Sequence, residues 1–121
     1  EKAKSATSTQ LDYIFVNVDY SLLKIVLSDI TWIEGLKDYL KINLHNSNKP
    51  PIVRMGMKNI EDMLPASQFI RIHRSALVQV DRIKELSPIL RGDYQVILKN
   101  GTKLRLSRNF KQNLKNVLEL S

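Results

Sequence analysis

The chain has 121 residues, of which 43% are hydrophobic and 26% charged, and it contains no cysteine. This length suits one domain with its own core, and the absence of cysteine excludes a disulfide framework, a thiol nucleophile and cysteine-ligated zinc. The net charge of +7 is typical of a nucleic-acid-binding domain, although an anionic membrane surface or an acidic protein partner also fits. No apolar run approaches the ~18 residues of a membrane span.

The first half of the chain predicts a polar tail followed by short strands. Residues 1–10 are small, polar and aperiodic, which is typical of a linker, and we expect the domain to cover residues 11–121. Because the first residue is Glu1, we expect the chain to be a piece of a longer protein, and no basic-then-apolar leader is visible. Alternating apolar and polar residues predict strands at residues 13–18, 23–27, 30–34 and 39–45.

The second half predicts more strands and two short helices. Met57, Ile60, Met63 and Leu64 recur at helical spacing, with Pro65 just beyond. Further strands are predicted at residues 52–55, 69–72, 76–80, 94–98 and 103–106. Asn100-Gly101 predicts a two-residue hairpin turn. A final amphipathic helix has an apolar side and Ser107 as its predicted N-cap; the apolar residues are Phe110, Leu114, Val117 and Leu118. The sum is a mainly β fold of eight to ten short strands.

No catalytic constellation is visible. The chain has two histidines, His45 and His73, and neither has a helical partner of the His-Glu-x-x-His type. With 4 glycines the chain contains neither a phosphate-cradling loop nor a dinucleotide fingerprint. We therefore expect no enzyme activity, no cofactor and no metal.

The cationic residues concentrate in two loops and in the C-terminal third. Residues 99–115 contain six Lys or Arg and no acid. Arg74, in the loop 71–75, and Arg108, in the loop 107–109, place planar donors at strand ends, where arginine reads guanine edges. A surface ion pair explains either arginine equally well from charge alone. The N-terminus of the last helix offers free N–H groups for a phosphate, and His73 is interpreted as a hydrogen-bonded structural histidine.

Three segments resemble the LytTR-type DNA-binding domain, the output module of many bacterial response regulators. The segment 69–75 (FIRIHRS) matches the family's Phe-Ile-Arg-x-His-Arg-Ser signature. The segment 30–39 (ITWIEGLKDY) is similar to a second family motif, and Leu106-Ser107-Arg108 resembles the Ser-Arg that opens the family's last helix. The chain departs from the pattern at Ala76, at 78–79 and at Trp32, which we interpret as variation in the core and at sheet edges.

The resemblance implies an elongated, mostly β fold of about ten strands in small sheets, in which loops rather than a recognition helix enter the DNA. It implies base-reading residues at Arg74, at Arg108 and at Lys37, Asp38 and Tyr39, with Asp38 ranked below the arginines. We expect contacts to the DNA backbone from a further set: Ser75, Lys103, Arg105, Ser107, Asn109, Lys111 and Lys115.

The resemblance further implies a cytoplasmic transcription regulator of a two-component system. Its partners would be promoter double-stranded DNA with imperfect direct repeats, an N-terminal receiver domain absent from this chain, and a second protomer on the DNA. The alternative is a small β domain that binds single-stranded RNA or a protein. Single-strand binders expose aromatic stacking platforms, whereas most aromatic residues here are expected in the core, with Tyr39 and Tyr94 as exceptions.

Overall fold

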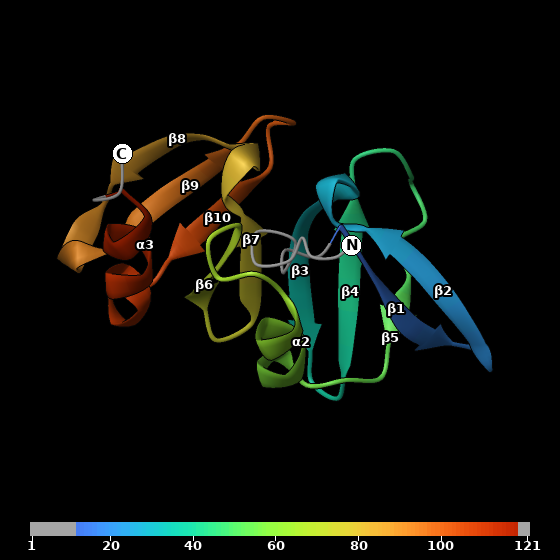
Figure 1. Cartoon of the computed structure of the whole chain (residues 1–121). Coiled ribbons are helices and arrows are strands. Elements are labelled where there is room, and N and C mark those ends of the chain that lie inside the picture. Colours follow the sequence, from blue (N-terminus) through green and yellow to red (C-terminus); the bar gives the residue numbers. More distant parts are fainter. Residues whose placement is uncertain (1–11, 119–121) are drawn as a thin grey trace, which may run out of the picture.

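The computed structural model describes residues 12–118 and contains ten strands in that range (Figure 1). The predicted mainly β class, with about ten short strands and two short helices, is confirmed. The strands are β1 (Tyr13–Val18), β2 (Ser21–Val26), β3 (Ile30–Leu36), β4 (Tyr39–Leu44), β5 (Ile52–Val53), β6 (Phe69–His73), β7 (Ala76–Gln79), β8 (Ile83–Pro88), β9 (Tyr94–Leu98) and β10 (Lys103–Leu106). The helices are α2 (Met57–Met63) and α3 (Lys111–Leu118), with single 3-10 turns η1 (Leu27–Asp29), η2 (Val80–Arg82), η3 (Leu90–Gly92) and η4 (Arg108–Phe110). The predicted tail at residues 1–10 lies outside the described residues.

Three antiparallel sheets follow one another along the molecule. The β1–β2 hairpin lies at one end, the three-stranded sheet β10-β9-β8 at the other, and the five-stranded sheet β5-β4-β3-β7-β6 between them (Figure 1). The central strand β3 pairs with both β4 and β7, and its register places Glu34 opposite Ala76. Because β7 therefore begins where β3 ends, the β3–β4 and β6–β7 turns emerge at the same edge of the sheet.

The middle of the central sheet, at β3 and β7, is covered on both faces. Ile33 and its cross-strand neighbour Leu77 face the first core, which the β1–β2 hairpin and α2 cover. Trp32 and Val78, one residue along each strand, face the second core, which the three-stranded sheet and α3 cover. Since side chains alternate across a strand, the continuous burial of β7 follows from a cover on each side.

The outer face of the β1–β2 hairpin corrects one expectation about the aromatic residues. Ile14 and Val16 are buried as the alternation predicts. Tyr13 and Phe15, on the opposite face, are 45% and 50% exposed, and Tyr20 at the turn is fully exposed. A two-stranded ribbon covers a core with one face only, so its second face stays in solvent whatever side chains it carries. The prediction that most aromatic residues lie in the core is therefore wrong for this hairpin.

Two features of the three-stranded sheet also differ from the prediction. Strand β8 is not indicated by alternation, because a bulge between Ile83 and Glu85 shifts the side-chain register and the strand lies at the sheet edge. The β9–β10 loop has three residues rather than two, since Leu98 and Thr102 face each other with the Leu98 N–H donating to the Thr102 carbonyl (2.8 Å). Of the residues in this loop, Gly101 alone has positive φ (+92°), so the backbone is not the two-residue turn in which both residues have positive φ.

Candidate nucleic-acid interface

Backbone hydrogen bonds join the loops that the sequence singles out. The Gly35 N–H, just before the β3–β4 turn, donates to the Ser75 carbonyl in the β6–β7 turn (2.8 Å). The Ser107 N–H, at the end of β10, donates to the Ile72 carbonyl just before the same turn (2.9 Å). The β3–β4 turn, the β6–β7 turn and the β10–η4 junction therefore form a continuous series, here called the loop row, and the first two point to the lower side of Figure 1.

The close approach of the first two loops depends on Gly35. A Cβ atom on this residue would lie 3.3 Å from the Ser75 Cα and 3.3 Å from the Met57 Cε. The Ser75 contact is with backbone, which cannot rotate away as a side-chain end can. Glycine at this position lets β3 and the β6–β7 turn come within hydrogen-bonding distance.

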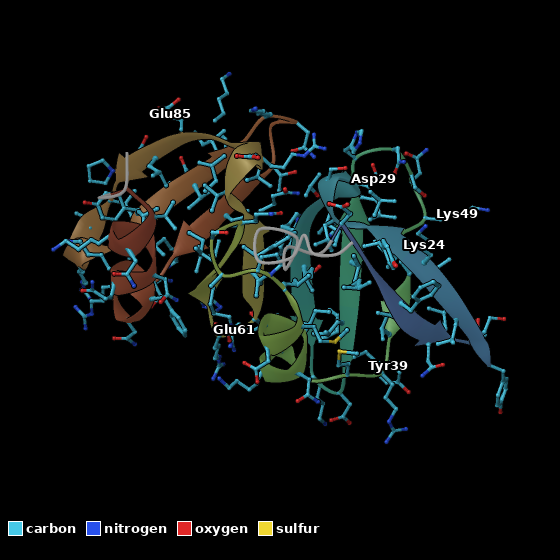
Figure 2. All side chains as sticks on the ribbon, in the orientation of Figure 1. Lys24, Asp29, Tyr39, Lys49, Glu61 and Glu85 are labelled. Atoms are coloured by element: carbon cyan, nitrogen blue, oxygen red, sulfur yellow. The ribbon has the colours of Figure 1, made fainter. Side chains whose placement is uncertain are left out.

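The β3–β4 turn is shorter than the gap between the strands predicted at 30–34 and 39–45. Gly35 and Leu36 belong to β3, so only Lys37 and Asp38 form the turn. Lys37 has φ of +63° while Asp38 does not have positive φ, which is the φ pattern of a type II′ turn. Positive φ in a residue other than glycine costs about 1 kcal/mol or more and is concentrated at functional sites. Tyr39, 41% exposed, lies on the same lower side of the molecule (Figure 2).

The Arg71 side chain fixes the backbone of the β6–β7 turn, a role that the sequence alone did not indicate. Its Nε donates to the His73 carbonyl (3.0 Å) and its Nη2 to the Arg74 carbonyl (2.6 Å). Its Nη1 pairs with Glu61 Oε1 (2.9 Å). The Glu61 side chain extends from α2 toward β6 (Figure 2). The planar guanidinium has the donor geometry needed for several acceptors at once. The two carbonyls of the turn are thereby fixed.

The Arg74 side chain itself projects from this fixed turn. It is exposed, and no hydrogen bond or ion pair to its guanidinium occurs among residues 12–118. The surface ion pair that explains an arginine equally well in sequence is therefore not formed by Arg74 in this part of the chain. Its five N–H donors are available to a ligand.

His73 and Ser75 bond to each other across the turn. The Ser75 N–H donates to His73 Nδ1 (3.2 Å), and the Ser75 Oγ lies 3.0 Å from the same nitrogen. Because a backbone N–H needs an acceptor, Nδ1 is unprotonated in the neutral ring, and the ring proton is assigned to Nε2. The geometry is compatible with the structural role predicted for His73, which stays a prediction.

Asp93 organises the other end of the loop row, and it was not among the predicted site residues. Its Oδ1 accepts the Arg108 N–H (2.9 Å), while its Oδ2 accepts from Nε (2.9 Å) and Nη2 (2.5 Å) of Arg105. The hydrogen bond from Arg108, followed by the Arg105 guanidinium, lowers the pKa of the Asp93 carboxyl below its ordinary value. Asp93 is 12 residues or more from both partners, so no local motif reveals this contact.

The Arg108 guanidinium is exposed and pairs with no carboxylate among residues 12–118. Its Nη1 donates weakly to the Arg91 carbonyl (3.3 Å), and the aliphatic part of its side chain lies beside Gly92, whose φ is +83°. Arg105 differs, because its guanidinium is already paired with Asp93. The two arginines predicted to read bases thus have free donors, whereas Arg105 has a structural partner.

The expected phosphate site at the last helix is not formed by free N–H groups. The Arg108 N–H donates to Asp93, and the Asn109 N–H to Ser107 Oγ (3.4 Å). The next two N–H groups donate to carbonyls: Phe110 to Ser107 and Lys111 to Arg108. Ser107 therefore caps the 3-10 turn η4, as its predicted capping role requires, but it also uses the donors that a phosphate would need.

The predicted lysine contacts lie at different distances from the turns. Lys103 is exposed and lines, together with Arg105, His73 and Ser75, a shallow hollow of about 260 Å³. Lys111 follows η4 directly, and its Nζ lies 5.5 Å from the centre of the Tyr94 ring. Lys115 and the Asn109 side chain are exposed. The structure thus brings Lys103 beside the β6–β7 turn and places the two helix lysines on α3.

Two kinds of site are absent from residues 12–118. No helix there is both long and apolar enough to cross a membrane. No group of three or more His, Asp or Glu side chains in that range is arranged to hold a metal ion.

These features define a β domain whose cationic loops are joined by backbone hydrogen bonds, and comparison with known proteins assigns its family. A sequence model of the LytTr DNA-binding domain matches residues 20–119, and the chain belongs to this family. The LytTr DNA-binding domain of a putative methyl-accepting/DNA response regulator from Bacillus cereus has the same fold, with a TM-score of 0.76 at 19% identity over 89% of this chain and 97% of that one.

The relatives in sequence are longer proteins. A sensory transduction protein LytT of Bacillus subtilis is 43% identical over 61 residues, covering 50% of this chain and 25% of the relative. The LytT protein of Bacillus anthracis is 26% identical over 99% of this chain and 48% of the relative. A transcriptional regulatory protein LytR of Staphylococcus aureus is 33% identical over 60% of this chain and 29% of the relative. The chain spans about half the length, or less, of these relatives.

Proposed function

We propose that the loop row reads the sequence of double-stranded DNA. The observation that carries this proposal is the state of Arg74 and Arg108, since both guanidinium groups are exposed and unpaired with carboxylates in the described residues, on loops joined by hydrogen bonds. A guanidinium held in place by a rigid backbone pairs with the O6 and N7 atoms of guanine. Lys37, Asp38 and Tyr39 supply a third base-reading loop beside Arg74.

The remaining residues of the proposed site position the domain on the DNA backbone. Phosphate contacts supply affinity without sequence information, and the net charge of +7 favours such contacts. We assign this role to Ser75, Lys103, Arg105, Ser107, Asn109, Lys111 and Lys115. Within this set, Lys103, Lys111 and Lys115 carry the largest share, because Arg105 is paired with Asp93 and the Ser75 and Ser107 hydroxyls are engaged.

At the level of the whole protein, we propose the output domain of a two-component transcription regulator that acts in the bacterial cytoplasm. Relatives bear the names of sensory transduction and transcriptional regulatory proteins, and they are about twice as long as this chain or longer. An N-terminal receiver domain would account for that additional length. Two protomers bound to direct repeats would gain affinity through effective concentration.

Selection of bound sites from random duplex DNA tests this function. We expect enrichment of a defined sequence, and of two copies at fixed spacing when two chains are artificially joined. As a control, Lys99→Ala removes an exposed charge from the β9–β10 loop, at the other end of β10 from Ser107, and should leave the enriched sequence unchanged. A pool that remains random would refute sequence-specific recognition.

One observation favours a second candidate, the binding of single-stranded RNA. Tyr13 and Phe15 are exposed on the β1–β2 hairpin with their ring centres 5.7 Å apart, and Lys24 Nζ lies 4.5 Å from the centre of the Tyr13 ring. Exposed aromatic rings beside a cation are what base stacking needs. Competition between the selected duplex and single-stranded RNA of the same sequence separates the two functions. Tyr13→Ala should weaken only RNA binding.

A further inference from the structure

The β8–β9 loop carries an apolar tip next to Arg108. Leu90 is 84% exposed and Ile89 is 46% exposed. A single exposed apolar side chain is ordinary on a protein surface. Leu90 and Ile89, however, are adjacent at the tip of a loop that contacts the proposed interface, so together they form an apolar surface at that interface.

Backbone hydrogen bonds close the β8–β9 loop. The Ile89 N–H donates to the Asp93 carbonyl (2.9 Å), and the Asp93 N–H donates to the Leu90 carbonyl (3.3 Å). Arg91, between them, has φ of +66°, a conformation that needs support from its surroundings. These bonds hold the tip in a defined shape before any ligand arrives, which lowers the entropic cost of binding.

The same loop is bonded to the arginine at the end of the loop row. The Arg91 carbonyl accepts from Arg108 Nη1, and the Asp93 side chain accepts the Arg108 N–H. The tip is therefore a fourth member of the series of loops, beyond the β10–η4 junction. Its position is fixed relative to the Arg108 guanidinium.

The charge around the tip favours a polyanionic partner. Arg91 and Arg108 flank it, and Asp93, the acid within the loop, is largely buried and already holds two arginines. An apolar group in a cationic setting matches the major groove, where thymine presents a C5-methyl group between phosphate backbones. An acidic protein would supply negative charge, but it would not present thymine methyl groups for the apolar tip to contact.

We propose that Leu90, supported by Ile89, contacts thymine methyl groups of duplex DNA beside the base that Arg108 reads. This inference rests on the proposed function of the loop row. It adds an apolar element of specificity, directed at thymine, to a set of sites that otherwise consists of charged and polar groups.

The test is a two-way comparison on the duplex that the wild-type chain selects. Leu90→Ala should weaken binding about three- to tenfold, as expected for the loss of one or two buried carbon groups. Replacing single thymines by deoxyuridine removes the methyl group alone, and one position should weaken wild-type binding similarly. At that position Leu90→Ala should make the replacement nearly neutral, because the two changes remove the same contact.

Leu22→Ala is the matched control. Leu22 is 67% exposed on the β1–β2 hairpin, at the other end of the molecule from β8 and β9 (Figure 1), and its removal should leave binding unchanged. Equal melting temperatures show that the variants fold. If Leu90→Ala binds like Leu22→Ala, or if no deoxyuridine position depends on Leu90, the inference is overturned while the proposed function stands. A wild-type chain that selects no sequence overturns both.

Discussion

Arg71→Lys is the substitution that most directly probes how the β6–β7 turn is held. Lysine keeps the positive charge but cannot donate to Glu61, the His73 carbonyl and the Arg74 carbonyl together, as the guanidinium does. We expect the lysine to keep one of these three contacts, so two hydrogen bonds are lost. At about 1 kcal/mol each, the free energy of unfolding should fall by about 2 kcal/mol.

The change in stability should be accompanied by weaker DNA binding. Without the two bonds, the carbonyls of the turn are no longer fixed, and the Arg74 side chain that projects from it samples more orientations. Denaturant unfolding and melting temperature measure the first effect, which corresponds to a fall in melting temperature of roughly 8 °C for a domain of this size. Binding to the selected duplex below the melting transition measures the second.

Arg82→Lys is the matched control. Among residues 12–118, Arg82 makes one side-chain hydrogen bond, from Nη2 to the Ser28 carbonyl (2.6 Å), at an exposed site at the far end of β7 from the turn. It should cost less than about 1 kcal/mol, because water replaces an exposed bond readily, and it should not alter DNA binding. Equal stability of Arg71→Lys and wild type would refute the reasoning about the turn.

Three further predictions follow from the site. Gly35→Ala should lower the free energy of unfolding by about 1–3 kcal/mol and weaken DNA binding, because its Cβ meets the Ser75 backbone at 3.3 Å; unchanged melting and binding would contradict the close-approach argument. The pKa of Asp93 is lowered in the folded state from 3.8, so its contribution to stability is present above about pH 4 and is lost as the pH falls through the lower folded-state value. Asp93→Asn should therefore flatten the pH dependence of unfolding below pH 4, and an identical profile would rule out this carboxyl as its source. Lys111→Ala should reduce the slope of log affinity against log salt by about 1, and an unchanged slope would remove Lys111 from the interface.

The strands that cover a core on one face could be predicted from the sequence. Leu40 and Ile42 alternate with polar residues in β4, and the burial follows that alternation. Strand β8 could not be predicted, since a bulge and an exposed edge position remove the alternation. The exposed rings of Tyr13 and Phe15 could not be predicted either, because residue type does not reveal that a ribbon has only one covered face.

The loops of the site could be located from motifs, but their supports could not. The segment 69–75 and Ser107-Arg108 mark two turns that the structure joins through Ile72. The residues that hold these turns are Arg71, which bonds to Glu61 of α2 and to two turn carbonyls, and Asp93, which accepts from Arg105 and Arg108, 12 and 15 residues further along the chain. The contacts of Asp93 leave no local pattern, which is why the Arg108 N–H appeared free in the sequence, whereas the Asn109 N–H is occupied by the predicted cap Ser107.

The base preference of Arg108→Ala tests the central claim most directly. Affinities of the wild type and this variant would be measured on the selected duplex and on every single-base change within it. We predict a loss of about 1–3 kcal/mol on the selected duplex together with relaxed preference at one base pair and unchanged preference elsewhere. A uniform loss across all duplexes, or no loss at all, would show that the loop row does not read bases through this arginine.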